Sequence, residues 1–277
     1  MNCVAESAKS ATVPVMSLPD YPMLFWVTAV AAVILVGIAK AGFGGGVGVI
    51  ATPLMALTIP VADAAALLLP LLILIDLISI RHYWGQFDRP SLKVLLPSAI
   101  IGIALGTLFF QTFSDNERAL KLGIGILAIL FVLYRLGQTA LQGAVIGKRL
   151  PGSVGHLLGA LAGFTSTLAH AGGPPVTIYL LPQKMPRTLF VGSTVIFFTI
   201  VNLVKLIPYS LLGLIQVGNL TTILLLSPLC FLGVRLGLWL NEHFTDLWFN
   251  RLVYTLLLLT GIQLVVGQSF ITLLAGN

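Results

Sequence analysis

Glycines and a lysine gather in the first apolar part of the chain, in the stretch GIAKAGFGGGVGVIATP from Gly37 to Pro53. Glycine costs about 1 kcal/mol relative to alanine in a helix interior, and a lysine in hydrocarbon costs about 3 kcal/mol, so the segment is poor as an ordinary span. Glycine does permit non-helical backbone, which survives at membrane depth only where protein buries it or it lines a wet cavity. The stretch therefore indicates a binding site or, alternatively, close helix packing.

A second glycine break, HAGGPP at 170–175, lies in the other half of the chain. A small anion in a low-dielectric cavity needs directed N–H groups, positive helix ends and a cation to replace its water. Half-helices starting at Val47 and Val176, just past the glycines, would direct free N–H groups at such an anion. Five glycines are therefore the first candidates for backbone donation to a substrate. They are Gly44, Gly45, Gly46, Gly172 and Gly173.

Lys40 lies beside the first break, and His170 holds a similar place at the second. Lys40 is either a counter-charge for the anion or a lysine that extends to the interface from a helix end. His170 either donates to the anion or carries a proton, or it is a helix-end histidine bonded to a carbonyl. Both residues are candidates for substrate binding.

Three further polar residues lie within apolar runs and are candidates for coupling transport to another ion. Asp76 is an intramembrane carboxylate, either a proton carrier or a partner of Lys40 or Lys205. Asn202 is its counterpart in the other half and does not ionise, so the position could also be a structural hydrogen-bonding one. Lys205, one helical turn beyond Asn202, is near enough to a span end to reach the interface.

The composition places these residues in a membrane protein. The 277 residues are 57% hydrophobic and 9% charged, with a mean hydropathy of +1.03, which is outside the range of soluble domains. Two cysteines give neither a disulfide framework nor metal-ligand spacing, and we expect no metal, no cofactor and no catalytic residue. The net charge of +6 comes from Lys and Arg scattered between apolar runs, which favours membrane orientation over nucleic-acid binding.

Matching features recur at a nearly constant separation along the chain. Gly45-Gly46 and Gly172-Gly173 lie 127 residues apart, and Asp76 and Asn202 lie 126 apart. The sequence predicts an all-α polytopic membrane protein with two inverted repeats, each a glycine-broken helical hairpin plus three transmembrane helices. The predicted parts are a flexible N-terminal tail at 1–22, repeats at 23–140 and 154–270, and a linker at 141–153.

Basic residues between the runs test this topology. If each broken pair is a hairpin, nine charges share one side and three the other, whereas single crossings would give seven to five. The nine are Arg81, Arg89, Lys93, Arg135, Lys148, Arg149, Lys184, Arg187 and Arg251, and the three are Lys9, Arg118 and Lys121. Because orientation follows the Lys and Arg excess, the hairpin topology is favoured, with both termini outside the cytoplasm.

At these residues the chain resembles the sulfite exporter TauE/SafE family of bacterial membrane transporters. The stretches that carry the resemblance are GFGGGVGVIATPLMAL and ADAAALLLPLLILIDLISIRHY in the first half, and GALAGFTSTLAHAGGPPVTIYLL in the second. The resemblance implies transport of small anions with sulfur or carboxylate groups across the bacterial inner membrane.

We therefore expect a secondary transporter, an exporter that works by alternating access as one half rocks against the other. Its partners would be a small anionic substrate and the lipid bilayer, with a homo-oligomer left open. The alternatives are a permease subunit that needs a separate ATPase, since the chain has no P-loop motif, and an intramembrane enzyme. For the enzyme, the chain offers Ser166 and His170 four residues apart on one helical face.

Overall fold

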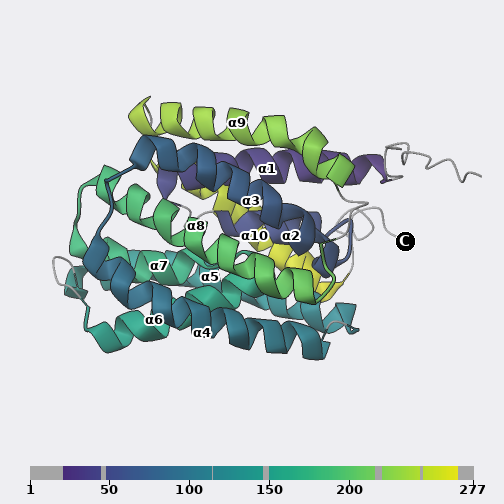
Figure 1. Ribbon diagram of the computed structural model, residues 1–277, viewed down its shortest axis with the longest axis horizontal. Coiled ribbons are helices and arrows are strands. Elements are labelled where there is room, and N and C mark those ends of the chain that lie inside the picture. Colours follow the sequence, from purple (N-terminus) through teal and green to yellow (C-terminus); the bar gives the residue numbers. More distant parts are fainter. Residues whose placement is uncertain are drawn as a thin grey trace, which may run out of the picture.

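The computed structural model describes residues 21–44, 48–113, 115–145, 150–215, 220–243 and 246–267. These residues form helices joined by short loops, with no strand among them (Figure 1). The first half contains α1 (Met23–Phe43), η1 (Gly48–Ile50), α2 (Ala51–Met55), α3 (Val61–Tyr83), α4 (Arg89–Phe113) and α5 (Glu117–Val145). The second contains α6 (Gly152–Ala169), α7 (Gly173–Leu180), η2 (Leu181–Gln183), α8 (Arg187–Leu211), α9 (Leu220–His243) and α10 (Asp246–Val266). The predicted all-α fold is confirmed.

Six helices in the described part of the chain are long and apolar enough to cross a membrane, for which about 20 residues are needed. They are α1, α3, α4, α8, α9 and the Glu117–Gly137 part of α5. The prediction of a polytopic membrane protein is thereby confirmed. Helix α5 continues to Val145, five residues beyond the boundary that we placed at 140 from the sequence.

Each break turns the chain back on itself. In the first half, the Oγ1 atoms of Thr28, near the start of α1, and Thr58, just before α3, lie 3.3 Å apart. In the second half, Gly155 near the start of α6 lies against the ring of Tyr179 near the end of α7. Each broken pair therefore begins and ends on the same side, which is the hairpin geometry expected from the sequence.

Contacts between the two halves are reciprocal. Helix α1 packs along α9 at one edge of the molecule and α4 along α6 at the other, while α3 packs against α8 between them (Figure 1). The hydroxyl of Tyr83 donates to the carbonyl of Ala41, and that of Tyr209 to the carbonyl of Thr167, each at 2.7 Å. The two donors, Tyr83 and Tyr209, are 126 residues apart, and so are the two acceptors, Ala41 and Thr167. This is the pattern that two related halves would give, and the inverted repeat itself stays a prediction.

Glycines bring the paired helices into backbone contact. A Cβ atom on Gly102 of α4 would overlap the carbonyl oxygen of Ala160 in α6. In the other pair, a Cβ atom on Gly233 of α9 would lie 3.0 Å from the carbonyl oxygen of Ile34 in α1. Small residues allow this close approach in membranes, where packing rather than water drives association. The packing explanation therefore applies to these glycines, which lie outside the two breaks.

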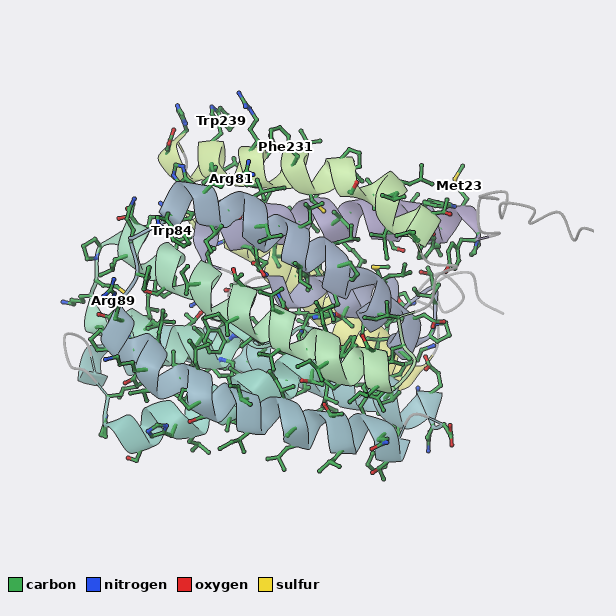
Figure 2. The ribbon with its side chains drawn as sticks, viewed as in Figure 1. Met23, Arg81, Trp84, Arg89, Phe231 and Trp239 are labelled. Carbon is green, nitrogen blue, oxygen red and sulfur yellow. The ribbon has the colours of Figure 1, made fainter. Side chains whose placement is uncertain are left out.

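Basic residues concentrate at one end of the molecule, the basic end, which carries Arg81 and Arg89. Of the twelve charges counted from the sequence, nine lie in the described ranges. Two of the nine, Arg118 and Lys121, are at the opposite end. The other seven lie toward the basic end and are Arg81, Arg89, Lys93, Arg135, Lys184, Arg187 and Arg251. Figure 2 shows Arg81, Trp84, Arg89 and Trp239 toward the basic end and Met23 at the other. Exposed tryptophans at this level are typical of a membrane interface.

The orientation in the membrane gives a first testable prediction. Helix α1 begins and α10 ends at the less basic end, where Arg118 donates to the carbonyl of Val265 at 2.6 Å. Because basic residues face the cytoplasm, we expect both termini in the periplasm. An alkaline-phosphatase fusion after Asn277 should be active and a fluorescent-protein fusion there dark. The reverse result would contradict the hairpin topology.

Candidate functional site

A cluster of buried polar side chains lies where α1, α3, α6 and α8 meet. Nζ of Lys40 on α1 forms an ion pair with Oδ1 of Asp76 on α3, at 2.5 Å. The amide of Asn202 on α8 donates to Oδ2 of the same carboxylate at 2.7 Å. All three side chains are buried. The carboxylate is thus held by two donors from two different helices.

Lys205, one turn beyond Asn202, is the centre of the second part of the cluster. Its Nζ atom donates to the carbonyl oxygen of Ser166 at 3.0 Å, to the hydroxyl of Ser166 at 3.0 Å and to Nδ1 of His170 at 2.8 Å. Three acceptors match the three N–H groups of an ammonium. The side chain is fully buried, so it does not reach the interface as the sequence allowed, because α6 encloses it.

Local backbone geometry explains why α1 and α6 end beside the cluster. Gly44 has φ of 74° and His170 has φ of 52°, both in the left-handed region, and the two positions are 126 residues apart. A residue in the left-handed region ends a helix, and its own N–H then hydrogen-bonds one of the last free carbonyl oxygens. The N–H of Gly44 donates to the carbonyl of Ala39, and that of His170 donates to the carbonyl of Ser166. His170 thus corresponds to Gly44, whereas the sequence suggested that it corresponds to Lys40.

The ring of His170 is fixed by its two contacts. Its Nε2 atom lies 2.9 Å from the carbonyl oxygen of Ala65 on α3. A carbonyl oxygen only accepts, so Nε2 carries a proton and donates, and Nδ1 accepts from Lys205. We assign this tautomer from the hydrogen-bond partners. His170 is therefore a neutral link between α8 and α3, and both of its ring nitrogens are engaged.

A small cavity opens beside these groups. It has a volume of about 20 Å³ and is lined by Val36, Lys40, Gly48, Leu72, Ser166, His170, Phe198 and Asn202. This is room for about one water molecule. Four of the lining residues belong to the polar cluster, and Gly48, just after the first glycine break, also lines the cavity. A larger hollow of about 370 Å³ lies near Trp84 and Arg89, with a mostly apolar lining.

The glycines chosen from the sequence have other surroundings. Gly45 and Gly46 lie outside the described residues. Gly44 ends α1 against the ring of Phe190, and Gly172 packs on the carbonyl of Ala162, neither of them lining the cavity. Helix α7 begins at Gly173, not at Val176. The next two residues, Pro174 and Pro175, have no N–H, so the start of α7 offers fewer donors than we expected.

The structure also adds Ser166 to the site. From the sequence this serine suggested only an enzyme-like pair with His170 or a helix contact. In the structure its hydroxyl and the Nδ1 atom of His170 both accept from Lys205, which occupies the ring nitrogen that a general base would need. One signal could have found it: Ser166 lies 126 residues after Lys40.

A polytopic α-helical fold with broken hairpins and an enclosed cluster of charged residues defines a class of membrane transporter. A family model described as Sulfite exporter TauE/SafE matches residues 29–264, and the chain belongs to this family. No curated protein and no solved structure matches the chain. The resemblance inferred from the sequence is confirmed, and the chain is a membrane transporter of this family.

Proposed function

We propose that the chain is a secondary transporter that exports small anions, such as sulfite, organosulfonates or related sulfur and carboxylate compounds, across the bacterial inner membrane. The observation that carries this proposal is the excess positive charge of the buried cluster. Lys40 is balanced by Asp76, but the three acceptors of Lys205 are all neutral. A buried charge is costly unless it is compensated, so this arrangement favours an anion as the substrate.

Export is supported by energetics. Moving one elementary charge through 100 mV is worth about 2.3 kcal/mol, which corresponds to a gradient of roughly 40- to 50-fold for a monoanion. The inside-negative potential drives an anion outward. An exporter of anions on this chain thus needs no ATP, which favours a secondary transporter over a permease with a separate ATPase.

The packing suggests which helices move together. The sequence favoured one half rocking against the other, yet the closest pairs, α1 with α9 and α4 with α6, each combine helices from both halves. We propose that α1, α2, α3 and α9 form one moving unit and that α4, α6, α7 and α8 form the second. The two units meet where α3 packs against α8. At that junction Asn202 donates to Asp76, and His170 donates to Ala65.

Neutralising Lys205 provides the test of the proposed function. Lys205→Gln removes the uncompensated charge while keeping a side chain that hydrogen-bonds. A hydrogen bond to a charged group contributes about 1.5–3 kcal/mol, so we expect anion flux to fall by at least about tenfold. Flux of radiolabelled sulfite and small carboxylates from proteoliposomes is the measurement.

Lys93→Gln is the matched control, because Lys93 is exposed on α4 and its loss leaves the basic end strongly positive. This variant should transport like the native protein. Unchanged flux in Lys205→Gln, or no flux of any anion in the native protein, would contradict the proposed function.

A further inference from the structure

The charges of the cluster can be counted from its contacts. Lys40 and Asp76 form an ion pair and cancel. Asn202 and Ser166 are neutral, and Lys205 donates to three neutral acceptors. Within the described residues, no carboxylate is paired with Lys205, and the carboxylate of Asp76 is paired with Lys40. The cluster therefore has one excess positive charge.

His170 keeps this count fixed. Its Nε2 proton is directed to the carbonyl of Ala65, and its Nδ1 atom faces the ammonium of Lys205 at 2.8 Å. A second proton on Nδ1 would place two donors, both positively charged, against each other. The arrangement of the ring thus favours the neutral imidazole, and the excess charge stays at one.

The apolar surroundings of the cavity disfavour any net charge that remains after the excess positive charge of the cluster has been compensated. Beside its polar residues the cavity is lined by Val36, Leu72 and Phe198, and Lys40 lies 5.3 Å above the ring of Phe198. Apolar walls leave little solvent to screen a net charge. One negative charge in the cavity makes the cluster neutral, whereas two leave an uncompensated negative charge in the membrane interior.

We propose that the site selects singly charged anions and discriminates against doubly charged ones of the same shape. This inference rests on the proposed function and narrows its substrate class. The chemistry that fits is a monoanion with compact oxygen acceptors, such as hydrogensulfite, a monosulfonate or a monocarboxylate. Doubly charged sulfate, and sulfonates that carry an additional carboxylate, would leave one negative charge of the substrate uncompensated.

Methanesulfonate and sulfate form a matched pair for the test. Both are tetrahedral and nearly equal in size, and at neutral pH they differ by one charge. We would measure uptake of each labelled anion into proteoliposomes at the same concentration, with the membrane potential clamped to zero so that the driving forces are equal. Methanesulfonate should be carried at least tenfold faster. Equal or faster sulfate flux would overturn this inference alone, and the absence of flux for any anion would overturn the proposed function with it.

A variant with one more positive charge in the cluster tests the inferred excess charge without a flux measurement. Asp76→Asn keeps the shape of the side chain but raises the excess charge from one to two. Sulfate should then stabilise the purified variant more than methanesulfonate does, as a larger rise in melting temperature, whereas the native protein should show the opposite order. Asp115→Asn, a change at an exposed carboxylate, should keep the native order. The same order in the native and Asp76→Asn proteins would contradict the charge count.

Discussion

Replacing Asp76 by alanine should lower the melting temperature of the purified protein by on the order of 10 °C and abolish anion flux. The variant leaves Lys40 buried beside a void, without its carboxylate partner at 2.5 Å, and Asn202 loses its acceptor. Breaking a buried ion pair by removing one partner costs about 3–5 kcal/mol. Asp115→Ala, which removes an exposed carboxylate, should change the melting temperature little.

A double variant separates stability from transport. Lys40→Met with Asp76→Leu replaces the ion pair by apolar groups, which is often neutral or stabilising in a buried site. We expect the melting temperature to return toward the native value while flux stays absent, because a polar wall of the cavity is gone. A double variant that remains as unstable as Asp76→Ala would contradict the account of Asp76 as the counter-charge of Lys40.

These variants also decide between two roles of Asp76. The sequence left it open whether the residue carries a proton or is structural. In the structure both of its oxygens face donors, Lys40 on one and Asn202 on the other, so the carboxylate fits this site in its charged form. A proton carrier would have to exchange one of these contacts for a proton in each cycle. The geometry therefore favours a structural counter-charge.

The elements of the fold were predictable because their signals are local. Apolar runs indicated the spans, and the glycine breaks indicated the two hairpins. Matching positions 126 residues apart identified Asp76 and Asn202, and the structure brings these two side chains to 2.7 Å because α3 and α8 pack against each other. A carboxylate inside a membrane also needs a partner, so the sequence alone made Lys40 one of two candidates for that partner.

The remaining features depend on which distant helices pack together. Lys205 lies only six residues from the end of α8, and distance along the chain alone allowed it to reach the interface. It is buried because α6, almost forty residues earlier, covers it and supplies Ser166 and His170. Helical periodicity places residues on the face of one helix, but it does not determine which other helix covers that face. For the same reason, the exchange of helices between the two halves was not foreseen.

Close packing of α4 on α6 leads to the last prediction. Gly163 of α6 faces the backbone of α4, where an added Cβ atom would overlap the carbonyl oxygen of Ala99. Backbone inside a helix does not shift by itself, so a leucine at this position must push the two helices apart. Overpacking typically costs about 1–3 kcal/mol, and separation of the whole glycine-lined contact adds to that. We expect Gly163→Leu to lower the yield of folded protein at least severalfold, measured as the monodisperse fraction after purification.

Gly123→Leu is the matched control, because a Cβ atom there meets nothing within 4 Å, and its yield should equal the native one. Equal yields for the two variants would show that α4 and α6 do not form a rigid unit through this contact.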